Sequence, residues 1–405
     1  MRRWSEGGVA KTGCLSLAGA GLLGVFFALL LMEAAVRLFL PQSGRPQYLP
    51  DPVVGYRHRP DQELWVSDES LEFRAWFSTN AHGDPDRERS LEKGEGVYRI
   101  AVVGDSMVES AQVARSERFT ELLEGALSEE TGLQVEVLNF GTSGYSTAQE
   151  WLYYREHVRS FRPDLVLLVF LPGNDIKNNS YHLEVERSCR PETSPFFTLA
   201  EAGALVLENE GFYERTQARF EAASRRSLGE RLRLLNLAQR AYAAIRSGSV
   251  GSERAAMLDQ DACQTRATLE LFDPRLQDRD PSWRQAWEVT AALLEQFSLD
   301  VAADGAGFLV AVATGPWEVQ PETRRYVLEL EDEEHYDWEL PHRMAGEMLS
   351  ELGLGHFLLL PGLKERADEA GDAIHFQYNG HYTAFGHRLV AEALLPEVLS
   401  ILSRE

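Results

Sequence analysis

A serine at the end of the first strongly apolar run is the first candidate for chemistry. Arg99–Val103 reads as a buried strand that breaks at Gly104-Asp105 and places Ser106 at its carboxyl end, where open α/β sheets bind their ligands. A serine hydroxyl is a weak nucleophile and needs a base within hydrogen-bond reach. The negative charge that its attack creates on an acyl oxygen needs hydrogen-bond donors aimed at that oxygen.

Two later segments, each after a hydrophobic run, supply such donors. They are residues 139–147 (NFGTSGYST) and 171–175 (LPGND). Gly144 permits a close backbone approach because it has no Cβ, and Asn174 offers a neutral amide. Together with the N–H of Ser106, these groups form a candidate oxyanion hole. Singly, each residue reads more easily as a helix cap or a turn, but their occurrence after three successive predicted strands favours chemistry.

The elements that must position these residues alternate between strand and helix. We predict strands at 98–103, 134–140, 164–171, 307–313 and 357–360. We predict helices at 119–129, 147–161 (capped by Thr147), 283–299, 340–352 and 385–402, with Pro396 kinking or shortening the last. This alternation predicts a doubly wound α/β sheet with right-handed crossovers.

These motifs together resemble the four sequence blocks of the SGNH hydrolases, also called the GDSL family. The matching residues are Gly104-Asp105-Ser106, Gly144, Gly173-Asn174-Asp175 and a C-terminal histidine. The resemblance is closer to membrane-anchored bacterial members with an insertion between the third and fourth blocks, and it covers roughly 96–180 and 282–405. It implies a three-layer α/β/α, flavodoxin-like parallel sheet. It also implies that Ser106 is the nucleophile and that Ser106, Gly144 and Asn174 form the oxyanion hole.

The fourth block departs from the family pattern and leaves two registers for the base. Asp372 and His375 have the usual spacing of acid and base, whereas His381 has the usual glycine, Gly386, five residues later but Asn379 in place of the acid. We favour His381, because the final helix then starts just past Gly386; His375 is the alternative base. Either Asn379 orients His381, or Asp372 approaches it from elsewhere. An Asn carbonyl orients an imidazole but does not stabilise its charged form.

Composition and charge narrow the class of protein. The formal net charge of −23 disfavours nucleic acid as a partner. No metal site or cofactor is expected, and the sequence does not give an oligomeric state.

Arg2, Arg3 and Lys11 precede the uncharged run Gly13–Met32, which is long enough to cross roughly 30 Å of hydrocarbon. This pattern predicts a single-pass anchor in a bacterial cytoplasmic membrane, with the catalytic part on the periplasmic or extracellular side.

The predicted organisation therefore has six parts. They are a cytoplasmic N-terminus (1–12), a transmembrane anchor (13–35), a tether and N-terminal extension (36–95), the first part of the catalytic core (96–180), a mainly helical insertion (181–281) and the second part of the core (282–405). A disulfide between Cys189 and Cys263 is favoured outside the cytoplasm. The insertion carries a basic amphipathic stretch around 228–245, which we interpret as a solvated helix face.

Three functions remain open on these residues. The first is a serine esterase that acts on O-acetylated envelope carbohydrate or on a lipid-like ester. The second is an O-acyltransferase of an exported polysaccharide, in which a sugar hydroxyl replaces water as the acceptor. The third is a non-catalytic module that binds carbohydrate or acyl groups, which the neutral Asn379 keeps open.

Overall fold

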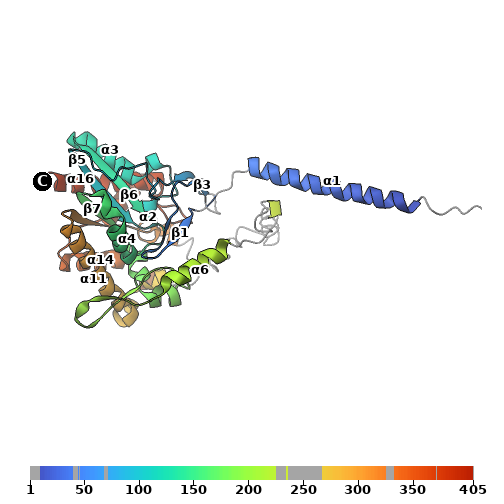
Figure 1. Cartoon of the computed structure of the whole chain (residues 1–405). Coiled ribbons are helices and arrows are strands. Elements are labelled where there is room, and N and C mark those ends of the chain that lie inside the picture. The colour runs from blue at the N-terminus through green and yellow to red at the C-terminus, as the bar shows by residue number, and fades with distance from the viewer. Residues whose placement is uncertain are drawn as a thin grey trace, which may run out of the picture. The chain divides into compact units, whose positions relative to one another are not determined.

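A computed structural model of the chain describes residues 10–39, 44, 46–67, 72–224, 234–235, 267–324, 333–370 and 372–404 (Figure 1). The chain divides into two compact units. One unit consists of Met1–Gln42 with Ala222–Ala256, and the other of Ser43–Glu221 with Met257–Glu405. The predicted catalytic residues all lie in the second unit, which is described next.

A five-stranded parallel sheet forms the centre of this unit, as the alternation of elements predicts. Its order is β11-β10-β7-β5-β6, and every neighbouring pair is parallel. In chain order, starting from the β6 edge, the strands run 2-1-3-4-5, as in flavodoxin-like sheets, so the order reverses between β5 and β7. The strands are β5 (Val97–Gly104), β6 (Gln134–Gly141), β7 (Leu165–Phe170), β10 (Gly307–Val312) and β11 (His356–Leu358).

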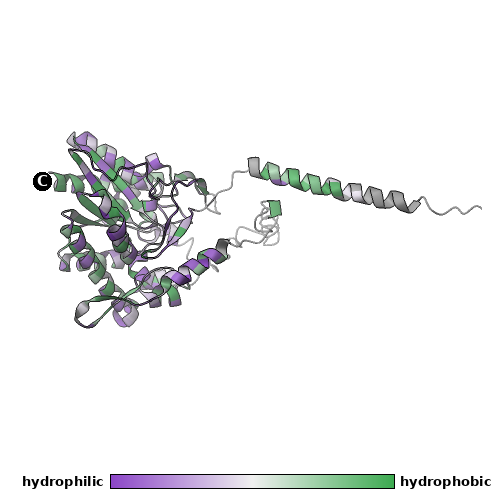
Figure 2. Cartoon of the chain, in the orientation of Figure 1, coloured by the Kyte–Doolittle hydropathy of each residue, from purple (hydrophilic) through white to green (hydrophobic). Residues whose placement is uncertain are grey.

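Helices cover both faces of the sheet, so the central strands bury apolar side chains on both faces. In β5, Ala101 and Val103 join one hydrophobic core, while Ile100 and Val102 join the other. The first core is closed by α4 (Thr147–Glu156), α11 (Pro281–Ala303) and α14 (Leu340–Glu351). The second is closed by α3 (Phe119–Thr131), α15 (Leu359–Ala370) and α16 (Ala384–Leu402). Figure 2 shows the hydrophobic strands between helices with mixed surfaces.

Several predicted helix limits were wrong, for local reasons. The N-cap of α4 is Ser146, in a capping box with Gln149, and α4 gives way to η2 (Val158–Phe161). Helix α16 begins before Gly386 and runs through Pro396 to Leu402. Proline has no N–H to donate to the carbonyl of Glu392, four residues earlier. Because Pro396 is exposed, this carbonyl lies on the solvent side of the helix, and the buried Leu394 and Val398 hold the turns on either side of Pro396 in place.

The N-terminal extension consists of two antiparallel hairpins. β1 (Tyr48–Asp51) pairs with β2 (Gly55–His58), and β3 (Glu63–Ser67) pairs with β4 (Arg74–Ser78). Phe77 is fully buried, and it packs in a small core with Val66, Phe73 and Ala111. The extension is therefore packed against the segment that follows the nucleophile and is more than a tether.

The described part of the insertion contains an antiparallel hairpin as well as helices. β8 (Phe197–Leu199) pairs with β9 (Leu205–Leu207), and α6 (Phe212–Ser224) follows. Cys189 is disulfide-bonded; Cys263 and the basic stretch 228–245, apart from residues 234–235, lie outside the described residues. The short elements elsewhere are α2 (Ser106–Glu109), η1 (Arg115–Glu117), α5 (Pro172–Asn178), η3 (His182–Arg187), η4 (Glu201–Gly203), α10 (Pro274–Arg279), α12 (Pro316–Val319), α13 (Pro321–Thr323) and η6 (Glu333–His335).

The segment predicted as a membrane anchor lies in the other unit, within α1 (Ala10–Phe39). Most of its described residues are exposed and apolar, among them Leu23, Phe26 and Leu31, and much of the ribbon of α1 is green in Figure 2. The prediction of a transmembrane helix is not supported. Within the ranges that the structure describes, no helix combines the length and apolarity that crossing a membrane requires.

Glycine at position 141 lets the end of β6 lie directly against the turn that carries the nucleophile. A Cβ at Gly141 would lie 2.0 Å from the backbone nitrogen of Glu109 and 2.4 Å from the carbonyl carbon of Val108. We expect Gly141→Ala to lower the free energy of unfolding by about 3 kcal/mol or more, because both backbones would have to separate. Gly173→Ala is the matched control, since nothing lies within 4 Å of the Cβ it would add. Thermal unfolding of both variants checks this; equal melting temperatures would contradict the contact.

Candidate active site

The nucleophile candidate lies where the strand order reverses. Ser106 is the first residue of α2, two residues after the end of β5, and it is buried. The N-cap of α2 is Asp105, whose Oδ1 accepts the N–H of Met107 at 2.8 Å. Within the described part of the chain, the Ser106 hydroxyl makes no hydrogen bond and its N–H finds no acceptor. Both groups are therefore available to a substrate.

The loop after β6 is held against this turn from both sides. Thr142 donates its N–H to the carbonyl of Gly104 at 3.0 Å. Asn139, at the end of β6, donates to the carbonyl of Val108 at 2.7 Å and accepts the N–H of Gly141 at 3.0 Å. Asn139 was not among the predicted site residues, although it opens the second motif. These bonds fix the distance between β6 and the first turn of α2.

Gly144 lies in this loop in a left-handed conformation, with φ +79°. A Cβ there would lie 3.0 Å from the Tyr56 hydroxyl and 3.8 Å from Nη1 of Arg190. Tyr56 donates its hydroxyl to the carbonyl of Ser143 at 3.0 Å. The N–H of Gly144 has no acceptor among the described residues. Both the φ angle and the neighbouring tyrosine explain the glycine, and the free N–H is the group that an oxyanion hole needs.

The side chain of Asn174 is hydrogen-bonded to Asp105, the residue before the nucleophile. It lies in the first turn of α5, after β7, and its Nδ2 donates to Oδ2 of Asp105 at 2.6 Å. An amide carries two N–H groups, so one proton of Nδ2 remains for a ligand. The structure thus brings the strand ends of Ser106, Gly144 and Asn174 to one edge of the sheet.

Buried carboxyl groups lie beneath this edge. Burial raises the pKa of Asp105 to about 6, against the opposing hydrogen bonds from Met107 and Asn174. Burial and the neighbouring acids also raise the pKa of Asp175 and of Glu150 well above their usual values. The Glu150 carboxyl has no hydrogen-bond partner among the described residues, so it favours the neutral form in the folded protein.

The two candidate bases have different surroundings. His375 is fully buried, with Nδ1 3.0 Å from the carbonyl of Gly380 and Nε2 3.2 Å from the hydroxyl of Thr314. His381 is half-buried, and its Nδ1 lies 2.6 Å from Oδ1 of Asn379. Both ring nitrogens of His375 are occupied by protein groups, whereas only Nδ1 of His381 is. Neither ring is hydrogen-bonded to Ser106 in the described structure.

Asp372 does not orient His381 in this structure. Asp372 is exposed and makes no hydrogen bond to a described residue. The neighbouring Ala373 accepts the Thr383 hydroxyl at 2.7 Å, and the Thr383 hydroxyl also accepts the N–H of Gly386 as the N-cap of α16. A Cβ at Gly386 would lie 2.2 Å from the carbonyl oxygen of Ile374. Glycine is required at position 386 because it packs closely on Ile374, next to His375. The start of α16 does not require it, since the helix already begins at Ala384.

A buried acid that sequence reasoning missed lies one helical turn after the nucleophile. Oε1 of Glu109 lies 2.8 Å from Nε2 of His58 and accepts the Tyr48 hydroxyl at 2.8 Å and the N–H of Ser143 at 3.2 Å. Burial alone would raise the pKa of Glu109, but His58 and its other donors hold that pKa below its usual value. A glutamate three residues after a serine carries no signal in the sequence, because its partners come from the N-terminal extension.

The charge on Glu109 acts on the candidate base. Burial lowers the pKa of His381, while the Glu109 carboxylate and the carbonyl of Asn379 oppose that shift. The neutral Asn379 therefore orients the ring, and the negative charge comes from Glu109.

We expect Glu109→Gln to displace the acidic limb of the pH–rate profile to lower pH, because the pKa of His381 falls when the negative charge is removed. We expect kcat to fall roughly tenfold, equivalent to about 1.4 kcal/mol of lost stabilisation of the imidazolium. Glu121→Gln is the control, since Glu121 pairs with Arg87 instead. Profiles of initial rate between pH 4 and pH 9 measure both effects (roughly, the range in which an imidazole titrates); an unmoved acidic limb would contradict the role of Glu109.

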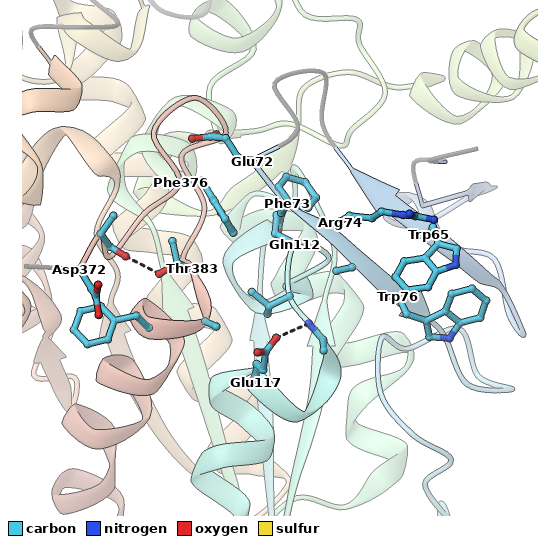
Figure 3. A pocket seen from close by; sticks show the side chains of 16 residues that line it. Trp65, Glu72, Phe73, Arg74, Trp76, Gln112, Glu117, Asp372, Phe376 and Thr383 are labelled. Atoms are coloured by element: carbon cyan, nitrogen blue, oxygen red, sulfur yellow. Dashed lines mark hydrogen bonds between the residues drawn. The ribbon is translucent and has the colours of Figure 1, made fainter. Parts of the chain in front are cut away.

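A groove of about 560 Å³ is lined in part by residues of the segment 372–385, which also carries His375 and His381 (Figure 3). Trp65 and Trp76, on the β3–β4 hairpin, line it and are 38% and 42% exposed. The groove also holds carboxyl groups, and Figure 3 shows them around its edge. They belong to Glu72, Glu117 and Asp372. Among the described residues, no group of three His, Cys, Asp or Glu side chains is arranged to hold a metal ion.

Comparison with known proteins finds solved structures of low similarity and nothing closer. No family model matches it, and no curated protein matches it. The solved structures that it resembles include the following three. An alpha/beta hydrolase enzyme from the metagenome of Lake Arreo, Spain, has 10% identity and TM-score 0.37, over 76% of this chain and 96% of that one. The acetyl xylan esterase AlAXEase has 11% identity and TM-score 0.38, over 74% and 99%. A mutant of the acetyl-xylooligosaccharide esterase Axe2 from Geobacillus stearothermophilus has 12% identity and TM-score 0.37, over 74% and 94%.

Proposed function

We propose that the protein is a serine ester hydrolase that removes acyl groups, with an O-acetylated carbohydrate as its substrate class. The observation that carries the proposal is the meeting of three strand ends at the point where the strand order reverses. There Asn174 is hydrogen-bonded to the residue before Ser106, and the Ser106 and Gly144 N–H groups have no acceptor among the described residues. A free hydroxyl beside free donors suits attack on an acyl carbon.

The proposed reaction proceeds in two halves. Ser106 Oγ attacks the acyl carbon while His381 Nε2 takes the hydroxyl proton. The backbone N–H groups of Ser106 and Gly144 and the side-chain amide of Asn174 stabilise the oxyanion. The carbon–oxygen bond to the alcohol then breaks, and the alcohol leaves with the proton from His381. Water repeats the sequence on the acyl-enzyme, which releases the acid and regenerates Ser106.

His381 must move its ring onto Ser106 for this reaction. The half-buried ring has Nε2 free of protein partners among the described residues, and catalytic hydrogen bonds often tighten only when substrate is bound. His375 would have to break bonds to Gly380 and Thr314 before it accepted a proton.

The lining of the groove does not include Ser106, Gly144, Asn174 or His381, so we propose the groove as a neighbouring surface that binds the rest of an extended, uncharged substrate. Trp65 and Trp76 present exposed rings, which offer flat apolar surface. The carboxyl groups of Glu72, Glu117 and Asp372 on the same groove repel an anionic polymer. A neutral acetylated glycan combines apolar ring faces with hydroxyl groups and fits both features.

Labelling with a fluorophosphonate probe tests the proposal. Such a probe reacts with an activated serine, so we expect covalent labelling at Ser106, together with release of free acetate from an acetylated oligosaccharide. Transfer of acetyl to an added sugar, with no free acetate, would assign the protein as an O-acyltransferase instead. Absence of both labelling and turnover would leave a non-catalytic binding module, for which the missing bond between Ser106 and a base is the supporting observation.

We also propose that the protein acts outside a bacterial cytoplasmic membrane, attached through residues 13–35. This proposal rests on the uncharged run Gly13–Met32 and the basic residues before it. Fractionation of cells, followed by alkaline extraction of the membranes, tests it. Recovery of the full chain in the alkaline supernatant would overturn stable attachment through this segment.

A further inference from the structure

A glutamate of the N-terminal extension holds the loop that carries the candidate base. Glu72 precedes β4, and its carboxylate accepts three consecutive backbone N–H groups more than 300 residues later in the chain. Oε1 accepts from Gln377 at 2.7 Å, and Oε2 accepts from Tyr378 and Asn379 at 2.9 Å each. Figure 3 shows Glu72 directed from the hairpin toward the segment of Phe376.

These bonds complete the backbone hydrogen bonding of the loop. Phe376 donates its N–H to the carbonyl of His381 at 2.9 Å, and Gly380 donates its N–H to the carbonyl of Phe376 at 3.0 Å. The three amides between them have Glu72 as their acceptor. Every N–H from Phe376 to Gly380 is therefore paired, and the conformation of the loop tip depends on one side chain from outside it.

The loop in turn fixes the imidazole. Asn379 is the last of the three residues bound by Glu72, and its Oδ1 lies 2.6 Å from Nδ1 of His381. A chain of contacts thus runs from the Glu72 carboxylate through the Asn379 backbone and side chain to the ring of His381. Asp372 makes no such contact in the described structure.

We propose that Glu72 is a positioning residue for His381, so that the N-terminal extension is part of the catalytic machinery. The inference rests on the proposed function. A carboxylate that accepts several backbone N–H groups binds them strongly, because charge-assisted hydrogen bonds are about twice as strong as neutral ones. Without it, the loop is released, and the ring loses the orientation that proton transfer to and from Ser106 requires.

We expect Glu72→Ala to lower kcat for a small soluble ester by roughly 10-fold to 100-fold, with KM changed by less than about threefold, because a small displacement of a catalytic group has effects of this size. Glu72→Gln retains an acceptor oxygen and is expected to give an intermediate kcat. Glu88→Gln is the matched control: Glu88 lies in the same N-terminal extension, outside the groove, and accepts only the N–H of Ala81, at 2.9 Å, among the described residues. It is expected to leave kcat within twofold of the wild type (about ±0.4 kcal/mol).

A double-mutant cycle separates positioning from general damage to the fold. Combined with His381→Ala, Glu72→Ala is expected to cause no further fall in the residual rate, because Glu72 acts only through that ring. Additive losses would assign Glu72 a merely structural role and overturn the inference, as would a wild-type kcat for Glu72→Ala. A fully active Ser106→Ala variant would refute the proposed function itself, whereas an inactive Ser106→Ala with a normal Glu72→Ala would refute only the inference.

Discussion

Ser106→Ala is expected to abolish turnover of acyl esters, with kcat falling roughly 10⁴-fold to 10⁶-fold, as removal of a serine nucleophile does in serine hydrolases. Loss of the hydroxyl removes the atom that forms the acyl-enzyme, and water in its place has no comparable position relative to the oxyanion donors. The Ser106 hydroxyl has no hydrogen-bond partner among the described residues. Its removal therefore leaves no buried group unsatisfied, and the free energy of unfolding should change by less than about 1 kcal/mol.

A second serine in the same turn provides the control. The Ser110 hydroxyl donates to the carbonyls of Met107 and Val108, at 2.9 and 3.0 Å. Ser110→Ala removes these bonds and is expected to cost about 1 kcal/mol of stability while most of the activity remains. Initial rates and thermal unfolding of the two variants give opposite patterns if Ser106 is the nucleophile. Residual activity above one hundredth of the wild type in Ser106→Ala (roughly 2.7 kcal/mol of barrier) would refute the assignment.

The central sheet was predictable because burial on both faces removes the alternation of polar and apolar residues. In β7 every residue from Leu165 to Phe170 is buried, and the apolar run in the sequence has the same limits to within one residue at each end. The strand limits of β5 and β6 follow for the same reason. The edge strand β11 was less predictable. Leu359 and Leu360, read as strand residues, begin α15, whose apolar face packs on the second core.

The residues around the candidate site were predictable only where a motif lies at a strand end. Ser106, Gly144 and Asn174 each follow a buried strand, so local pattern and sheet geometry together place them. Glu72 and Glu109 lie in segments without regular periodicity. Their partners come from distant parts of the sequence: residues 377–379 for Glu72, and Tyr48 and His58 for Glu109. No spacing rule in a single sequence encodes such contacts, because they arise only when the N-terminal extension packs on the core.

Asn379 shows how a correct local observation leads to an incomplete mechanism. From the sequence, an asparagine in the place of the acid predicts an oriented but unstabilised imidazolium. In the structure the negative charge of the buried Glu109 carboxylate raises the pKa of His381 and so favours its charged form. Under the proposed function, orientation and charge, which one aspartate combines in the usual triad, are divided between Asn379 and Glu109.

Replacement of the candidate base, His381, is expected to have the second-largest effect on kcat. We expect His381→Ala to lower kcat roughly 10³-fold to 10⁴-fold, because Ser106 would then lack a general base and the leaving alcohol a general acid. Burial lowers the pKa of His381, so the ring is neutral and competent as a base at neutral pH. Added imidazole is expected to restore part of the activity, since the cavity left by the side chain is half-exposed.

His375→Gln is the matched comparison. Burial lowers the pKa of His375 to about 3, and its two nitrogens are bound by Gly380 and Thr314, so it is a neutral structural group. Its replacement is expected to cost about 1–3 kcal/mol of stability through unsatisfied buried partners, with kcat per folded molecule reduced by less than about tenfold (1.4 kcal/mol). Circular dichroism and thermal unfolding give the folded fraction of each variant. A His375→Gln variant that folds but fails to turn over, beside an active His381→Ala, would transfer the role of base to His375 and require the loop at Gly380 to open during catalysis.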